Sequence, residues 1–141
     1  MEEIRQENRQ IIGRSKTVRE LLSGMKYTID YYQREFKWGE KQIKELVNDL
    51  VNAFYESHEE NHVRKEVADY GHYFLGSIII SVKSGQSFII DGQQRLTSLT
   101  LLLIYLNNLQ QAKGKIDVKI DELIYSEKYG EKSFNLNIEE R

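Results

Sequence analysis

The sequence predicts a single α+β domain, a small mixed sheet packed by helices, over residues 1–141. Two long segments have apolar residues at helical spacing, and runs of aromatic and β-branched residues typical of strands lie between them. We find no linker, repeat or low-complexity segment that would mark a second domain. The terminal residues 133–141 alternate apolar and polar like a strand and then stop. We therefore expect a domain truncated at its C-terminal end.

The first elements are a short helix, a brief strand and a long helix. Residues 17–20 have the spacing of a capping box, and the apolar face behind them ends at Gly24. Residues 27–29 are typical of a strand. Apolar residues then recur at helical spacing over residues 41–55, after a plausible start at Gly39.

Residues 57–69 are dense in charge and have no clear period, which predicts a solvated loop or a frayed helix end. Within them, His58-Glu-Glu-Asn-His62 matches the His-Glu-x-x-His zinc motif. A zinc hydrolase needs this motif on a helix with a buried apolar side and a third ligand, and the sequence offers neither. We rank a histidine-based zinc hydrolase last and expect the match to be fortuitous.

A hairpin and a second long helix are predicted next. Residues 73–80 and 87–90 are rich in aromatic and β-branched residues and flank a glycine-containing turn, as in two hairpin strands. Gly76 inside the first of them would allow close backbone approach. After Asp91-Gly92 the apolar spacing becomes helical as far as about Gln110. Residues 115–120 are predicted as a strand or the start of a short helix.

Composition excludes several classes of function. The formal net charge of -2 gives no overall attraction to DNA, so any DNA contact would need a local basic patch or another part of the protein. The absence of cysteine excludes thiolate chemistry and fits a reducing compartment. The N-terminus lacks a signal peptide, and the longest apolar run, residues 101–106, is too short to cross a membrane. We expect a cytoplasmic protein.

The segment from Asp91 to Arg95 has the composition of a phosphate site. An aspartate-glycine pair is commonly a hairpin corner, but the helical spacing that follows places Gly92 at a helix N-terminus, which favours anions. Gly92 would let backbone approach a phosphate, and Arg95 would bind phosphate oxygens through two hydrogen bonds. Gln93 and Gln94 would orient a water or a base edge.

Asp91 and Thr97 have more than one possible role. Asp91 would hold a hydrated magnesium ion or cap the helix, and we class it with Gln93 and Gln94 as a candidate catalytic group. Thr97 is a candidate nucleotide ligand, although its hydroxyl, like that of Ser98, is expected to bond back to the helix backbone.

A second segment, Tyr31 to Trp38, places Gln33 and Arg34 among aromatic residues. The glutamine and the arginine would contact phosphate or base, and the aromatic rings would stack on a base. The alternative is aromatic core packing, with Arg34 in a structural ion pair.

These segments resemble the GmrSD restriction endonuclease N-terminal family. Two motifs of this family occur in the sequence, as Ile29-Asp-Tyr-Tyr-Gln-Arg-Glu-Phe-Lys-Trp38 and Ile90-Asp-Gly-Gln-Gln-Arg-Leu-Thr97. Residues 46–50 and 73–78 also match, so the likeness spans residues 18–106. Asp30 replaces the usual proline, which removes a rigid turn but no obvious chemical group.

The resemblance implies a ParB- and sulfiredoxin-like fold whose Asp91 to Arg95 loop contacts nucleotide phosphates. It implies NTP hydrolysis in the restriction of modified phage DNA, and it assigns DNA cutting to a separate C-terminal nuclease domain. The competing hypothesis is a non-catalytic module in which residues 31–38 hold a modified base and the later loop contacts the DNA backbone. We expect no nuclease activity from this chain and leave its NTPase activity as a hypothesis.

Overall fold

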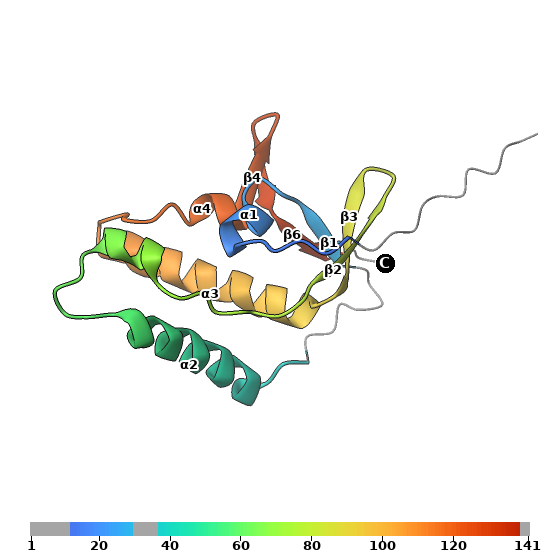
Figure 1. Cartoon of the computed structure of the whole chain (residues 1–141). Coiled ribbons are helices and arrows are strands. Elements are labelled where there is room, and N and C mark those ends of the chain that lie inside the picture. The colour runs from blue at the N-terminus through green and yellow to red at the C-terminus, as the bar shows by residue number, and fades with distance from the viewer. Residues whose placement is uncertain (1–11, 30–36, 139–141) are drawn as a thin grey trace, which may run out of the picture.

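The computed structural model describes residues 12–29 and 37–138 and contains, in that part of the chain, a mixed four-stranded sheet (Figure 1). Its strands are β1 (Tyr27–Ile29), β2 (Ile79–Lys83), β3 (Gln86–Asp91) and β6 (Leu136–Ile138). The spatial order is β2-β3-β1-β6. Strand β1 runs parallel to β3 and β6, whereas β2 runs antiparallel to β3. The predicted α+β class with a small mixed sheet is confirmed.

Helices accompany this sheet, and the first short one and the two long ones were predicted from the sequence. They are α1 (Val18–Leu22), α2 (Glu40–Ser57), the 3₁₀ helix η2 (Arg64–Asp69), α3 (Gln93–Ala112) and α4 (Asp121–Ile124). A hairpin of β4 (Tyr125–Lys128) and β5 (Glu131–Phe134) projects from the body of the molecule (Figure 1). Among the described residues, no helix combines the length and apolarity needed to cross a membrane.

The hydrophobic core lies where α1, α3 and α4 meet the sheet. Its buried cluster consists of Leu22, Tyr27, Ile29, Ile89, Leu96 and Leu123. The Tyr27 hydroxyl donates a 2.5 Å hydrogen bond to the backbone carbonyl of Leu21, so its polar group is satisfied inside the core. Burial raises the pKa of Tyr27 above its ordinary value.

Asn135 joins the C-terminal strands to this core. Its side chain is buried, and its amide nitrogen donates to the carbonyls of Leu22 at 2.9 Å and Glu122 at 3.1 Å. Its amide oxygen accepts a hydrogen bond from Ser126. The buried amide therefore ties α1, α4 and β4 together, a role that the sequence did not indicate.

The structure corrects two predicted elements. The strand predicted over residues 73–80 begins only at Ile79, because Gly76 has a φ of +112°, which does not fit a regular strand. Residues 115–120 form neither the strand nor the short helix that we expected, and α4 begins at Asp121. The glycine-containing hairpin turn is confirmed, with positive φ at Ser84 and Gly85.

Two further predictions are confirmed in part. The charged segment 57–69 is an irregular loop after α2, but it ends in the helix η2. The strand-like C-terminal pattern forms two short strands, β5 and β6, that are separated at Asn135.

Candidate functional site

Two motif-bearing segments leave the sheet at the same edge. The strands β1 and β3 are parallel neighbours, with Ile29 opposite Ile89 near their carboxyl ends. The chain after β1 leads to residues 30–38, and the chain after β3 leads to the Asp91 to Arg95 turn. In open α/β sheets the carboxyl ends of parallel strands are the usual place for ligands.

A side-chain contact links the two segments. The Gln94 side-chain oxygen accepts hydrogen bonds from the backbone N–H groups of Lys37 at 2.6 Å and Trp38 at 3.1 Å. The end of the aromatic segment therefore lies against the start of α3. Gln33 and Arg34, the predicted binding residues of that segment, lie outside the described residues.

The turn at Gly92 connects a strand to a helix, as predicted. Gly92 is the N-cap of α3 and has a left-handed backbone, with a φ of +91°. As a glycine, this N-cap residue has no side chain with which to cap the helix. The sheet register also shifts here, since Ile79 pairs with Asp91 while Ile80 pairs with Ile89. Such bulges re-aim side chains and are common beside active sites.

Packing explains why residue 92 is a glycine. A Cβ atom there would lie 3.0 Å from both the carbonyl oxygen of Ser77 and the Cγ1 atom of Ile78. The left-handed backbone would also strain any other residue. Residues 77 and 78 thus fill the space where a Cβ atom of residue 92 would stand. The expected close approach of a phosphate to Gly92 remains a prediction.

Arg95 is held by the irregular segment before β2. A Cβ atom at Gly76 would lie 2.5 Å from the Cζ atom of Arg95 and 2.9 Å from its Nη2 atom. The Nη1 atom is closer still to that position, and it donates a 3.3 Å hydrogen bond to the carbonyl of Ser77. The missing side chain of Gly76 thus makes room for the guanidinium group. The close approach predicted at Gly76 is confirmed, with Arg95 as its partner.

The two glutamines of the turn have different surroundings. The Gln94 oxygen is engaged by the two backbone N–H groups before α2. The Gln93 side-chain oxygen is buried and has no hydrogen-bond partner among the described residues. An orphaned buried acceptor is unfavourable and calls for a donor. Of the two side-chain oxygens, only that of Gln93 is thus left without a donor by the described residues.

The remaining predicted residues lie beside this turn. Asp91 is the exposed last residue of β3, and Thr97 is partly buried in the second turn of α3. The Ser98 hydroxyl donates to the backbone carbonyl of Gln94 at 2.8 Å, so its expected backbone role is confirmed. No cluster of three or more metal-ligating side chains occurs in residues 12–29 and 37–138.

Asp49 and Tyr73 belong to the same neighbourhood, and sequence reasoning gave neither a role. The Tyr73 hydroxyl donates a 2.8 Å hydrogen bond to Asp49 on α2. This bond raises the pKa of Tyr73, burial and the Asp49 charge add to the effect, and the positive charge of Arg95 opposes it. The signal available in the sequence was their position in the two minor family motifs, residues 46–50 and 73–78.

The histidine pair forms a separate aromatic cluster at the end of α2. Residues 58–62 follow the helix and are not helical themselves. The Nδ1 atoms of His58 and His62 lie 2.7 Å and 2.8 Å from the Tyr70 hydroxyl, and Phe54 stacks on His58. The zinc motif thus lacks its helix, and its histidines make contacts typical of packing.

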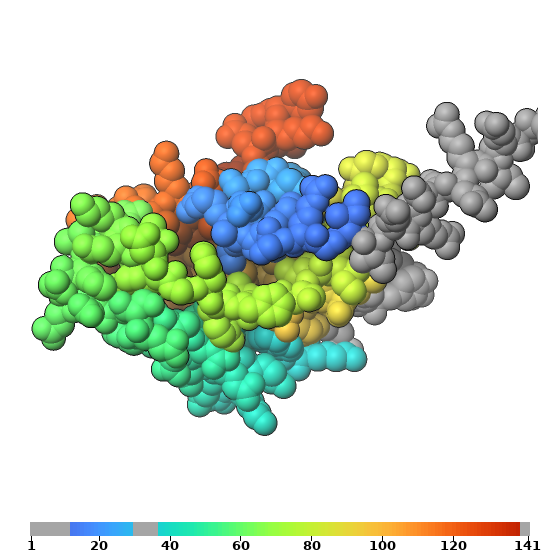
Figure 2. All heavy atoms as spheres, in the orientation of Figure 1, coloured from blue at the N-terminus to red at the C-terminus, as the bar shows by residue number. Residues whose placement is uncertain are grey.

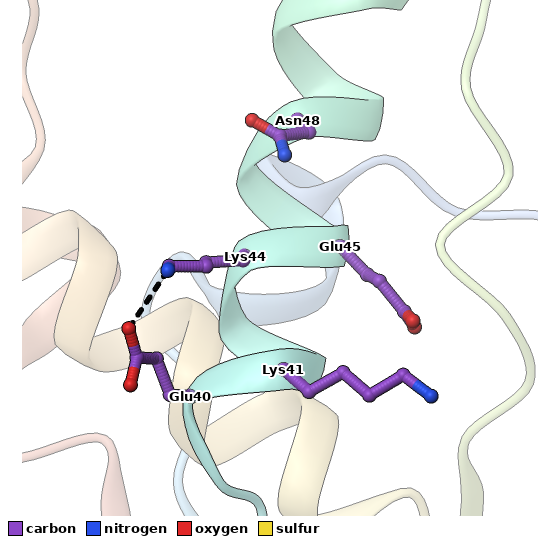
Figure 3. Close-up of a pocket in the computed structure, with 5 residues that line it drawn as sticks. All are labelled: Glu40, Lys41, Lys44, Glu45 and Asn48. Atoms are coloured by element: carbon purple, nitrogen blue, oxygen red, sulfur yellow. Dashed lines mark ion pairs between the residues drawn. The ribbon is translucent and has the colours of Figure 1, made fainter.

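A shallow depression of about 420 Å³ lies on α2 (Figure 3). It is lined by Glu40, Lys41, Lys44, Glu45 and Asn48. Lys44 and Glu40 form a 2.8 Å ion pair across one helical turn. These side chains all come from one charged helix face, which is typical of a solvated surface rather than a binding site.

Comparison with known families confirms the family predicted from the two motifs. The sequence matches the family described as GmrSD restriction endonuclease, N-terminal domain, over residues 18–141. No curated protein and no solved structure gives a significant match. The family match includes the Gly92 turn, Arg95 and the segment that holds it. The chain therefore belongs to the GmrSD restriction endonuclease N-terminal domain family.

Proposed function

We propose that this domain binds and hydrolyses a nucleoside triphosphate, with the phosphates at the start of α3. The observation that carries the proposal is the convergence of two motif segments at one sheet edge. They leave adjacent parallel strands, and Gln94 joins them by two hydrogen bonds. This edge is where ligands bind in comparable sheets.

The electrostatics of this edge favour an anion. Gln94 on the first turn of α3 bonds to the residues just before α2, so both long helices begin at the site. Each helix N-terminus carries roughly half a positive charge and backbone N–H groups directed outward. The N-cap of α3, Gly92, has no side chain to cap its helix, whereas at the start of α2 the Gln42 side chain accepts from the Gly39 N–H at 2.9 Å.

Arg95 and Gln93 supply the side chains for recognition. Arg95 is partly buried, and among the described residues its guanidinium group makes one hydrogen bond, to Ser77. Its other N–H groups are suited to phosphate oxygens. The buried oxygen of Gln93 would accept from a ribose hydroxyl, from a base amine or from the water that attacks the γ-phosphate.

Asp91 fits a magnesium ion that arrives with the triphosphate. Magnesium is usually held by one or two carboxylates together with substrate phosphates. Asp91 offers one exposed carboxylate at the edge of the site, and the described residues contain no ready metal cluster. When bound, the ion would neutralise charge on the phosphates. Gln33, Arg34 and Thr97 complete the proposed nucleotide contacts.

Family membership makes this chain part of a restriction and defence protein. We propose that its fold is ParB- and sulfiredoxin-like and that nucleotide turnover controls restriction of modified DNA. The cutting activity would lie in a separate nuclease domain or subunit. This domain would then act as the nucleotide-dependent control element.

Calorimetric titration tests the proposal. ATP, GTP and CTP are titrated with magnesium into the wild-type chain and into Arg95→Ala, with Arg64→Ala as the matched control. Arg64 lies on η2 and its side chain is exposed. We expect at least one nucleotide to bind, Arg95→Ala to weaken its binding by about tenfold or more, and Arg64→Ala to leave it unchanged.

The contrary results are equally specific. Equal nucleotide affinity in Arg95→Ala and wild type would remove Arg95 from the site. Absence of nucleotide binding, together with salt-dependent binding of modified DNA, would favour the DNA-sensing hypothesis instead.

A further inference from the structure

The irregular segment Tyr73–Ile78 crosses the surface and connects α2 to the start of α3. Figure 2 shows this yellow-green stretch between α2 and the blue segment that contains α1. Tyr73 at one end bonds to α2, and Gly76 and Ser77 contact Arg95 on α3. Ser77 and Ile78 also pack against Gly92. A segment that belongs to no strand or helix thus contacts α2 at one end and the proposed phosphate site at the other.

We propose that Asp49 and Tyr73 are positioning residues for Arg95, because they fix the segment that receives its guanidinium group. The role of Arg95 in phosphate binding rests on the function proposed above. The seating of its side chain is a separate claim and has its own test.

The outer end of the segment depends on one tertiary hydrogen bond. The Tyr73 hydroxyl and the Asp49 carboxylate are 2.8 Å apart, and a hydrogen bond to a charged acceptor is stronger than a neutral one. Asp49 lies in the middle of α2, which is a rigid anchor. Tyr73 is 39% exposed, and Tyr73→Phe keeps its ring, so this variant removes the hydrogen bond alone.

The inner end of the segment, Gly76 and Ser77, holds the guanidinium group of Arg95, and we call these two residues the seat. Gly76 has a φ of +112° and no side chain, so its backbone lies directly against the guanidinium group. The carbonyl of Ser77 accepts from Nη1 of Arg95. A long arginine side chain has many rotamers, and such contacts select one of them before a ligand arrives. Loss of the Tyr73 anchor would therefore weaken phosphate binding although Tyr73 touches no phosphate.

Nuclear magnetic resonance tests the seat without any nucleotide. The guanidinium N–H resonances of Arg95 are assigned as those missing in Arg95→Lys, and their exchange with water is measured in Tyr73→Phe. The matched control is Tyr105→Phe, which removes a hydroxyl from a residue that is 60% exposed on α3. We expect exchange to accelerate about tenfold in Tyr73→Phe and to stay unchanged in the control.

Variants of Asp49 separate positioning from general destabilisation. Asp49→Asn keeps an oxygen that accepts from Tyr73 and should preserve the slow exchange, whereas Asp49→Ala should abolish it. Unchanged exchange in both Tyr73→Phe and Asp49→Ala, with the amide spectrum of a folded chain, would overturn the proposal.

Inorganic triphosphate with magnesium then probes the consequence for binding. We expect about tenfold weaker affinity in Tyr73→Phe than in Tyr105→Phe. Failure of the wild-type chain to bind either triphosphate or nucleotide would refute the proposed function, while the exchange rates would still decide the seating of Arg95. Normal triphosphate affinity in a Tyr73→Phe variant whose Arg95 exchanges rapidly would contradict the positioning role.

Discussion

Replacement of Gly76 by alanine should both strain the backbone and displace Arg95. Alanine at a φ of +112° is strained by about 1–3 kcal/mol. The new methyl group would overlap the guanidinium group, with Cζ at 2.5 Å, so the flexible arginine must move and lose its bond to Ser77. That bond contributes about 1 kcal/mol. The free energy of unfolding should fall by about 2–4 kcal/mol in total.

A double-mutant cycle isolates the contact from the strain. In an Arg95→Ala background no guanidinium group remains to be displaced, so Gly76→Ala should reduce the free energy of unfolding by only the strain of about 1–3 kcal/mol. The difference between the two backgrounds, about 1 kcal/mol, is the coupling between the residues. Urea unfolding of the four proteins measures it by linear extrapolation.

Gly85 provides the matched control for this cycle. It also has a positive φ, +75°, but a Cβ atom there would meet nothing within 4 Å. Gly85→Ala should therefore be destabilising and additive with Arg95→Ala. Equal effects of Gly76→Ala in both backgrounds, within about 0.5 kcal/mol, would show that the guanidinium group does not occupy the seat.

Three other contacts give predictions. Gln94→Leu should accelerate hydrogen exchange at the amides of residues 37–38, because these amides lose their acceptor. Gln94→Glu keeps an acceptor oxygen and should not accelerate the exchange. Equal exchange rates in the two variants would contradict the contact. Asn135→Leu should reduce the free energy of unfolding by about 2–4 kcal/mol in urea, because the buried carbonyl of Leu22 and the partly buried carbonyl of Glu122 lose their donor; a change below about 1 kcal/mol would refute this. Because burial raises the pKa of Tyr27, the folded chain keeps a proton that the unfolded chain releases. Stability is thus present below about pH 10 and lost as pH rises through the folded pKa. Chemical unfolding at about pH 9 and about pH 11 should show a smaller loss of stability in Tyr27→Phe than in Tyr105→Phe, and equal losses would count against the shift.

The sequence predicted those elements whose local pattern agrees with their tertiary surroundings. Strong helical spacing located α2 and α3, and the change of spacing after Asp91 correctly placed Gly92 at a helix start. The motif pair also led to the correct family. These signals are local, and no tertiary contact overrides them.

The failures occur where distant residues decide the structure. The composition of residues 73–78 favours a strand, but Gly76 adopts a positive φ and its backbone receives a side chain from α3. The hydrogen bond from Tyr73 to Asp49, 24 residues away, produces no periodic pattern in the sequence. The strand β4 carries two charged residues and lacks the alternation of apolar and polar residues by which strands are found.

The most direct test of the proposed function is to map nucleotide contacts on the amide resonances of the folded chain. ATP, GTP and CTP are added with magnesium while the ¹H–¹⁵N spectrum is recorded. We predict that the largest shifts occur at the amides of residues 92–95 and at Lys37 and Trp38, which bond to Gln94. Shifts concentrated on the charged face of α2 or on the β4–β5 hairpin, with none at residues 92–95, would contradict a phosphate site at the start of α3.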